Sequence, residues 1–589
     1  LKEGKTRPDS EIKAFAGEIA GIIDKDSDEV YENMKKNQAL VRIAKYLDKE
    51  TADKLRKLKI SGIELSEDTK RYYPLGNFAS QVLGSVNDDN MGRTGIELQY
   101  DQYLSGVSGR WVKNTDLLGN ELVKGAEEYY EAQDGLNVVM TLDEAIQYYV
   151  EKALEKGMKK TKADRIMCLV MDPKTGDVLA SATTPGYDPN NATEPLAKDK
   201  KKYDKMSADD KNKYLFSLWR NPLVSDTYEP GSTFKLITSS SAIEEKVIND
   251  NTTFHCSGSF TVAGVRLHCW THGAHGTQTI RQAVGNSCNP ALAKVASLMG
   301  KTRFYKYLDL YGITDKTGID YPGESGAIVQ NIDNVGPVEL ATIGYGQGIS
   351  LTPIQLLTAV NAIGNDGVLL QPRYVKALTD SEGKVVESYE PTVVRKVISS
   401  ATAKKMRSIM QYVVDEGGGG NARIAGCRVG GKTGTAQKLD AVRGGYLENE
   451  YIASFCGFGP IEDPQAICLV VLDNPRGVYY GGLVAAPVFR ETMGQIMRYL
   501  EIPSNEQRGG SEDSEEKHGH KSIPNLPEKN INEFRLPNFY GWSMRDTGEW
   551  INGAGLGFKP EGTGFADSQS PGPGVTVKRG EDVTVHFSR

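Results

Sequence analysis

The chain contains the stretch Tyr-Glu-Pro-Gly-Ser-Thr-Phe-Lys at residues 228–235, on which the interpretation of its other parts depends. Pro230 and Gly231 indicate a loop, and the apolar run that follows indicates a helix. Ser232 and Lys235 would then share one helix face. A neighbouring base makes a serine hydroxyl nucleophilic, and a lysine that is partly desolvated or near other cations can be that base. The pair predicts a serine nucleophile at a helix start, where free backbone N–H groups can stabilise an oxyanion.

The S-x-x-K spacing is common and needs support from other motifs. Ser10 and Lys13 have the same spacing in a stretch that is typical of a surface helix, with a capping serine and a solvated lysine. A second motif, Ser287-Cys288-Asn289, follows residues 228–235 along the chain, although S-x-N also occurs at Ser85. A third motif is therefore needed to select between these copies.

The third motif is Lys-Thr-Gly-Thr at residues 432–435. K-T-G also occurs at Lys174 and Lys316, both among turn-forming residues. Lys432 follows both earlier motifs and is predicted on a core strand, where Gly434 leaves room for a substrate beside the backbone. Lys432 is therefore the copy of K-T-G whose position in the chain and expected setting fit a third motif after S-x-x-K and S-x-N.

The composition indicates an ordinary globular protein with several domains. The chain has 589 residues, of which 39% are hydrophobic and 25% charged, and this length predicts about three or four domains. The net charge of −7 argues against a nucleic-acid partner. No run approaches the ~18 apolar residues of a membrane span, and no signal peptide is visible.

Composition and hydrophobic periodicity divide the chain into four parts. Residues 1–140 combine amphipathic helices with strand-like segments, and residues 141–502 alternate helices with strands. Residues 503–534 are rich in Ser, Glu, Gly and Pro and predict a flexible linker. Residues 535–589 predict a small module with strands and one short helix. The strands expected around the third motif are residues 422–429, 451–459 and 466–472. A hairpin is expected after the first motif, at residues 253–270.

The three motifs, in this order, closely resemble those of class B penicillin-binding proteins, which are peptidoglycan D,D-transpeptidases. Further matching blocks are Gly-Tyr-Gly-Gln-Gly at residues 344–348 and Arg-Tyr-Tyr-Pro at residues 71–74. The tail resembles a single PASTA repeat, with Pro-Asn-Phe-Tyr-Gly at residues 537–541. The resemblance implies a multidomain α+β protein. It would have a mixed N-terminal pedestal domain, a transpeptidase domain with a central antiparallel sheet flanked by helices, and a small α/β PASTA-like module.

The family resemblance also implies a role for each motif residue. Ser232 would attack the D-Ala-D-Ala carbonyl of a peptidoglycan stem peptide with Lys235 as base, and Ser287 would relay a proton towards the leaving amine. The residues implied in substrate binding are Asn289, Lys432, Thr433, Gly434 and Thr435. The backbone N–H groups of Ser232 and Thr435 would form the oxyanion hole. β-Lactams would acylate Ser232 as substrate mimics, and no cofactor is needed for this chemistry.

A group of Cys and His residues departs from this pattern. Cys256, Cys269, His272 and His275 have the spacing C-x12-C-x2-H-x2-H, which suits a tetrahedral structural zinc site. Cys288, inside the S-x-N motif, is an alternative ligand. Two other interpretations stay open: a Cys256–Cys269 disulfide, since the family acts outside the cytoplasm, and no special role.

Several functional alternatives also stay open. The single PASTA-like repeat favours a sporulation-specific enzyme of spore cortex synthesis, and a vegetative division enzyme is the nearest rival. A serine β-lactamase shares the three motifs, and a non-catalytic cell-wall binding protein would use the tail. The resemblance further implies an N-terminal anchor that precedes Leu1, a place on the outer face of the cell or forespore membrane, and a membrane glycosyltransferase partner.

Overall fold

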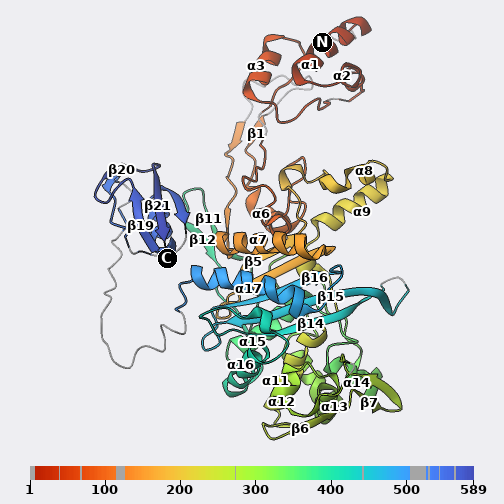
Figure 1. Ribbon diagram of the computed structural model, residues 1–589. Helices are drawn as coiled ribbons and strands as arrows, with labels where there is room; N and C mark the ends of the chain where they lie inside the picture. Colours follow the sequence, from red (N-terminus) through yellow and green to blue (C-terminus); the bar gives the residue numbers. More distant parts are fainter. Residues whose placement is uncertain are drawn as a thin grey trace. The chain divides into compact units, whose positions relative to one another are not determined.

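The computed structural model in Figure 1 describes most of the chain. The described residues are 7–38, 40–66, 69–113, 127–271, 273–440, 443–503, 526–527, 531–540, 542, 544–562 and 565–588. They belong to two units, one with residues 1–76 and 86–91 and one with residues 77–85 and 92–589. Most of the predicted linker, residues 503–534, lies outside the described residues. Of the helices in the described part, none has both the length and the apolar character that a membrane span requires.

The smaller unit contains three helices, as its amphipathic sequence predicts. They are α1 (Asp9–Ile23), α2 (Ser27–Met34) and α3 (Lys49–Lys57). Asp26 and Asp48 precede α2 and α3, and each accepts a hydrogen bond from a backbone N–H of the first turn, as helix caps do. The helices bury a small core made of Ala16, Ile19, Ala20, Val30 and Leu55. Ser10 and Lys13 lie exposed on α1, which confirms that this copy of S-x-x-K belongs to a surface helix. The expectation that Ser10 caps the helix is wrong, because Pro8 is the cap residue and Ser10 lies within the first turn.

A five-stranded antiparallel sheet lies at the centre of the larger unit. Its order is β14 (Gly430–Leu439), β15 (Tyr446–Gly459), β16 (Ala466–Asp473), β4 (Arg165–Met171) and β5 (Val178–Thr184). β4 and β16 are nearly continuous apolar runs, which is typical of strands buried on both faces. The predicted central antiparallel sheet is confirmed.

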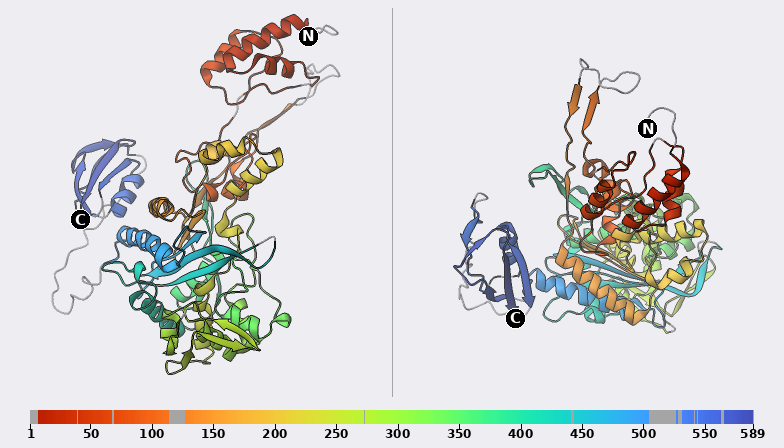
Figure 2. Two further views of the ribbon diagram at one scale, coloured as in Figure 1. Left: turned by 45° about the vertical axis from the view of Figure 1, so that its right-hand side comes forward. Right: turned by 90° about the horizontal axis from the view of Figure 1, so that it is seen from above.

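Helices cover both faces of this sheet (Figures 1 and 2). Successive side chains of β16 point to opposite faces. Cys468, Val470 and Leu472 pack in one core, with α7 (Glu144–Thr161) and α17 (Gly481–Tyr499). The intervening side chains of β16 pack in the other core. That core includes α11 (Lys235–Glu244), α15 (Pro353–Gly364) and α16 (Ser400–Asp415).

One predicted strand is wrong. Residues 422–429 were expected as a strand, but a 3₁₀ turn ends at Ala422 and β14 begins only at Gly430. The reason is packing. A Cβ on Gly431 would lie 2.4 Å from the ring of Phe455, so the glycines that look like a strand terminator let β14 approach β15 closely.

A second layer of helices and short strands lies below the sheet in Figure 1. Its elements are β6 (Thr253–Cys256), β7 (Ser259–Val262), β8 (Val265–His268), β9 (Gly276–Thr279), α12 (Ile280–Gly285), α13 (Asn289–Leu310) and α14 (Pro337–Gly344). The predicted hairpin is confirmed as β7–β8, which turns at Ala263 and Gly264, both with positive φ, as in two-residue hairpin loops. The structure adds the β6–β9 pair, which places Cys256 opposite Gly276.

The other helices and strands between Ser80 and Lys396 are short except for α9, which has 12 residues. They are α4 (Ser80–Leu83), α5 (Gly95–Gln99), α6 (Asp101–Leu104), β1 (Arg110–Lys113), β2 (Glu127–Tyr130), β3 (Asn137–Met140), α8 (Lys200–Tyr203), α9 (Ala208–Trp219), α10 (Pro222–Ser225), β10 (Val368–Leu370), β11 (Val375–Thr379), β12 (Val385–Ser388) and β13 (Val393–Lys396). β1 and β2 form a ribbon, and β3 pairs with β11.

The C-terminal residues form a small module with its own core. Its elements are β17 (Glu533–Arg535), α19 (Met544–Gly553), β18 (Gly557–Gly562), β19 (Phe565–Ser570), β20 (Thr576–Lys578) and β21 (Asp582–Ser588). β21 pairs in parallel with β18 and antiparallel with β19. Phe539, Trp550, Ile551 and Val583 are among the side chains that it buries. The predicted small α/β module is confirmed.

Candidate active site

The predicted nucleophile lies on a short 3₁₀ turn, residues Gly231–Thr233, that leads directly into α11. Gly231 has φ 53°, and a Cβ there would lie 3.1 Å from the carbonyl oxygen of Thr435, so the loop and β14 pack closely. Thr233 Oγ1 donates to the carbonyl of Pro230 at 2.7 Å and closes the turn. Lys235 is fully buried at the start of α11. The expected arrangement of Ser232 at a helix start is confirmed.

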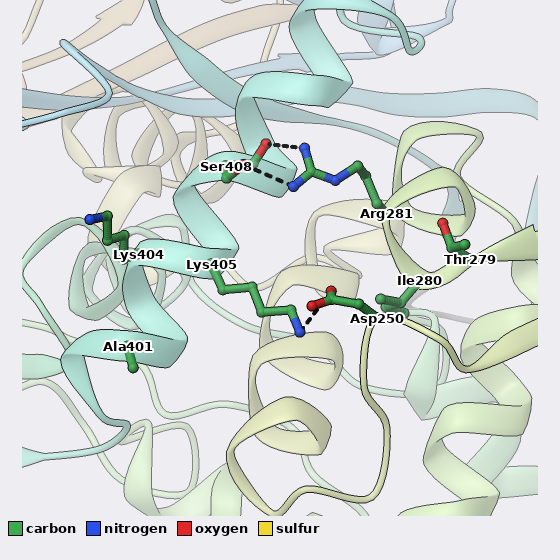
Figure 3. A pocket seen from close by; sticks show the side chains of 8 residues that line it. All are labelled: Asp250, Thr279, Ile280, Arg281, Ala401, Lys404, Lys405 and Ser408. Carbon is green, nitrogen blue, oxygen red and sulfur yellow. Dashed lines mark hydrogen bonds and ion pairs between the residues drawn. The ribbon is translucent and has the colours of Figure 1, made fainter.

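The S-x-N motif forms the tight connection between α12 and α13. Ser287 has φ 55°, in the left-handed region that is unfavourable for a residue with a Cβ. α12 is held against α16: Arg281 donates to Ser408 Oγ at 2.9 Å across the pocket shown in Figure 3. A Cβ on Gly285 would lie 2.6 Å from the ring of Tyr412, also on α16. This close packing fixes where the Ser287 turn lies.

The K-T-G motif lies on β14, at the edge of the central sheet, beside the nucleophile turn. Lys432 is fully buried. A Cβ on Gly434 would lie 2.3 Å from Ser454 Oγ and 3.0 Å from the carbonyl oxygen of Pro230, so only glycine fits. Thr435 Oγ1 accepts a hydrogen bond from the backbone N–H of Gly481 at 3.0 Å, which ties β14 to the start of α17.

Hydrogen bonds join the three motifs at Ser287. Its Oγ donates to Ser232 Oγ at 2.7 Å, and it accepts from Lys432 Nζ at 3.0 Å and from Lys235 Nζ at 3.3 Å. Lys235 Nζ also donates to the carbonyl of Ser287 at 2.6 Å and to Asn289 Oδ1 at 2.7 Å. Lys235 is therefore linked to Ser232 through the hydroxyl of Ser287.

Burial shapes the electrostatics of the two lysines. It lowers the pKa of Lys235 to about 7, because an ammonium loses its hydration there. Burial also lowers the pKa of Lys432 well below its usual value, and the charge of Lys235 adds to this effect. A neutral amine is thus accessible near neutral pH at a hydrogen-bonded distance from Ser287, which is what a general base requires.

Glu229 is a buried residue of the site to which the sequence alone gave no role. Its carboxylate accepts from the backbone N–H of Gly348 at 2.7 Å and from the hydroxyl of Tyr446 at 3.1 Å. Burial raises the pKa of this carboxyl group. Glu229 thus connects the nucleophile loop to β15 and to the glycine-rich turn at residues 344–348. The sequence feature that could have identified Glu229 is its charge, because the stretch around it is otherwise apolar and turn-forming.

Four of the predicted Cys and His residues come together beside this site. The Sγ atoms of Cys256, Cys269 and Cys288 and one ring nitrogen of His275 all lie within 4.8 Å of one another. Each Sγ of Cys256 and Cys269 lies 3.6 Å from His275 Nδ1. All three thiols are buried and free. His272, the other predicted ligand, lies outside the described residues.

Comparisons with known proteins agree with this geometry. Residues 166–494 match the penicillin-binding protein transpeptidase domain, residues 2–140 the penicillin-binding protein dimerisation domain, and residues 534–589 the PASTA domain. Stage V sporulation protein D of Bacillus subtilis is 35% identical over 97% of this chain and 84% of its own length. Peptidoglycan D,D-transpeptidase FtsI of Escherichia coli is 28% identical over 83% of this chain and 77% of its own.

A solved structure supports the same assignment. Penicillin-binding protein 3 from Mycobacterium tuberculosis, crystallised in complex with aztreonam, superposes with a TM-score of 0.63. It is 30% identical, and the match covers 74% of this chain and 91% of that one. The chain belongs to the penicillin-binding protein transpeptidase family.

Proposed function

We propose that this chain is a class B D,D-transpeptidase that cross-links peptidoglycan stem peptides through an acyl-enzyme on Ser232. The observation that carries the proposal is the hydrogen-bonded path from Ser232 through Ser287 to two buried lysines. It provides a nucleophile, a relay and a base within reach of one another, as covalent acyl transfer requires. Relatives that are named as peptidoglycan D,D-transpeptidases, such as FtsI of Escherichia coli, support the same reaction.

In the acylation step, Ser232 Oγ attacks the carbonyl carbon of the penultimate D-Ala. Its proton passes to Ser287 Oγ while the proton of Ser287 passes to the neutral amine of Lys235, 3.3 Å away. The carbon–nitrogen bond then breaks, and the proton returns along the same path to the amine of the leaving D-Ala. A bond from Ser232 to the donor peptide remains, and one D-Ala is released.

The other motif residues hold the donor peptide. Asn289 would hydrogen-bond its amide, and Lys432, Thr433 and Thr435 on β14 would bind its terminal carboxylate. The substrate can pass close to β14 because Gly434 has no side chain. An amine from a second stem peptide then attacks the ester, forms the cross-link and returns the proton to Ser232. The stem peptides would belong to lipid-linked or nascent glycan.

Labelling with a fluorescent penicillin tests the proposal. We expect wild-type protein to form a covalent adduct, Ser232→Ala to form none, and Ser10→Ala, in the surface copy of the motif, to label as wild type does. A wild-type protein that does not label contradicts the enzyme assignment and favours a non-catalytic cell-wall protein. Rapid hydrolysis of the adduct, within seconds, would instead indicate a serine β-lactamase.

We further propose that the enzyme acts in spore cortex synthesis. The match to stage V sporulation protein D spans 97% of this chain, including the C-terminal module. We expect an N-terminal anchor, a position on the outer face of the cell or forespore membrane, and a membrane glycosyltransferase as partner. Deleting the gene in the source organism should reduce heat-resistant spores while vegetative growth continues. Filamentation of growing cells would contradict this and favour a division enzyme.

We also propose that Cys256, Cys269, His275 and Cys288 bind one structural zinc ion. Three thiolates and one imidazole are a common structural zinc set, and ligands about 2.0–2.3 Å from zinc lie roughly 3.4–3.8 Å apart. The 3.6 Å contacts of His275 fit that spacing. Metal analysis should find one zinc per wild-type chain and much less in Cys269→Ser. Wild-type protein without stoichiometric metal after equilibration with zinc would exclude the site.

A further inference from the structure

The buried carboxylate of Glu229 lies three residues before the nucleophile and is bonded to a residue of β15. We propose that the hydrogen bond between Glu229 and Tyr446 holds the nucleophile loop, residues 228–231, at a fixed distance from β14, and so fixes the separation of the two backbone N–H groups of the oxyanion hole. Glu229 and Tyr446 are then positioning residues, because they act through the backbone of Ser232 and Thr435. This inference rests on the transpeptidase function proposed above.

The two halves of the oxyanion hole belong to different elements. One N–H comes from Ser232 on the 3₁₀ turn, and the other comes from Thr435 on β14. Both donors stabilise an oxyanion only when each lies about 2.7–3.1 Å from it. Packing sets a lower limit to their separation, since a Cβ on Gly231 would lie 3.1 Å from the carbonyl oxygen of Thr435. An upper limit requires an attractive contact between the two elements.

Glu229 is held rigidly on the nucleophile loop. Its Oε1 accepts a hydrogen bond from the backbone N–H of Gly348 at 2.7 Å. The backbone beside it is fixed as well, because Tyr228 exchanges two hydrogen bonds with Leu351, at 3.0 and 2.9 Å. The residue is only 4% exposed. The carboxylate is therefore a fixed extension of the loop, and a group bonded to it is held at a defined distance from that loop.

The other end of this contact is Tyr446, the first residue of β15. Its hydroxyl donates to both carboxylate oxygens of Glu229, at 3.2 and 3.1 Å. Burial and the charge of Glu229 raise the pKa of Tyr446, so its hydroxyl stays protonated and keeps donating. Tyr446 lies opposite Leu439 of β14, and the pairing of the two strands is irregular between Gln437 and Leu439. Since such irregularities disrupt the ladder and bend a strand, this end of β14 depends on an outside contact.

Hydrogen bonds through Ser287 also join the two elements, but they cannot take over this role. The bonds from Ser287 to Ser232 and from Lys432 to Ser287 belong to the path along which protons move, so they rearrange during acylation. The bond between Glu229 and Tyr446 lies outside this path and stays in place while the oxyanion forms. Preorganised donors stabilise an oxyanion most, because they need no reorganisation at that moment.

Variants of the full-length chain test the contact. Tyr446→Phe keeps the ring and removes the hydrogen bond, and we expect the first-order rate constant of penicillin acylation to fall about 10-fold. The dissociation constant of the non-covalent complex should change little. Glu229→Gln, whose amide oxygen can still accept one bond, should lose less. Tyr307→Phe is the matched control, because it removes a similar bond to Glu245, 3.1 Å long, and should acylate as wild type does. Folded Tyr446→Phe that acylates at the wild-type rate overturns the proposal.

A thiocarbonyl substrate separates the oxyanion hole from a general effect on the fold. Sulfur accepts hydrogen bonds weakly, so wild-type protein should be acylated faster by an ester analogue of the donor peptide than by the corresponding thionoester. In Tyr446→Phe the ratio of these two rates should fall about 10-fold, because only the carbonyl substrate loses stabilisation. An equal loss of rate with both substrates overturns the proposal. Wild-type protein that is acylated by neither substrate nor by penicillin overturns the transpeptidase function instead.

Discussion

The chain contains Lys-Thr-Gly both in the strand of the proposed active site and in a surface segment, and the same three residues behave differently in each. At residues 432–434 they lie on β14, with the lysine fully buried and its amine 3.0 Å from Ser287 Oγ. At residues 316–318 they lie in an irregular segment, with the lysine exposed. The tripeptide therefore has no intrinsic function, and its neighbours determine what its donors bind.

The donors of the second copy are used for structure. The backbone N–H and the hydroxyl of Thr317 both donate to Glu324 Oε1 at 2.6 Å, and the N–H of Gly318 donates to Glu324 Oε2 at 3.1 Å. The turn thus binds a carboxylate of its own chain. On β14, the hydroxyl of Thr433 instead accepts a weak bond from Lys432 at 3.3 Å. This leaves its donor capacity for the carboxylate of a substrate.

The largest difference between the two copies is expected from removing their lysines. Lys432→Ala should lower the second-order rate constant of penicillin acylation by about 10²–10³-fold, because a preorganised donor beside the reacting serine is lost. Lys316→Ala, the matched control, should leave the rate unchanged. Stopped-flow acylation with both variants measures this, after melting curves show that each is folded. Equal acylation rates for the two variants would show that Lys432 is not part of the site.

Substituting the glycine of each copy should have different effects: on the acylation rate at residue 434 and on the free energy of unfolding at residue 318. Gly434→Ala places a Cβ 2.3 Å from Ser454 Oγ and 3.0 Å from the Pro230 carbonyl, so β14 must shift and acylation should fall by about 10²-fold. Gly318→Ala adds a Cβ at φ +75°. It should reduce the free energy of unfolding by about 1 kcal/mol without changing the acylation rate. A Gly434→Ala enzyme with normal kinetics would contradict the close fit at β14.

The pH dependence of acylation should show whether Lys235 acts as the base, and whether the copy at residues 316–318 affects it. Lys235 must be neutral to accept a proton, and its pKa is lowered to about 7 by burial. The rate should therefore rise about tenfold per pH unit below pH 7 and level off above it. A pH profile of penicillin acylation measures this, and Lys316→Ala should follow the same curve. A rate that keeps rising to pH 10 would show that Lys235 keeps an ordinary pKa.

Much of this site follows from sequence because its chemistry is local in each motif. The spacing of Ser232 and Lys235, the glycine-rich surroundings of the turn copies and the β7–β8 hairpin are all short-range signals. The residue at which β14 begins cannot be predicted from such short-range signals. Gly430 and Gly431 read as a strand end, and only the ring of Phe455 on the next strand explains why glycine is required there.

The remaining features depend on contacts between distant segments. Cys288 joins Cys256 and His275 because β6 pairs with β9 and α13 begins beside them, which spacing along the chain does not reveal. The link from Lys235 to Ser232 through Ser287 needs the same three-dimensional information. The order of the motifs along the chain predicts which residues lie close together, whereas the tertiary structure determines the order in which a proton passes among them.

The smallest effect on catalysis is expected from substitutions of Glu324, whose carboxylate accepts hydrogen bonds from the Lys-Thr-Gly copy at residues 316–318. Glu324→Ala removes the acceptor of two backbone N–H groups and the hydroxyl of Thr317 in a segment where Glu324 is buried. Donors left without a partner destabilise a fold by about 1–3 kcal/mol. The unfolding midpoint in urea should therefore decrease, while the acylation rate of the folded protein stays at the wild-type value. Glu324→Gln keeps one acceptor oxygen and should lose less stability than Glu324→Ala. If either variant slowed acylation as strongly as Lys432→Ala does, the turn at residues 316–318 would be part of the active site, and the distinction between the two copies would fail.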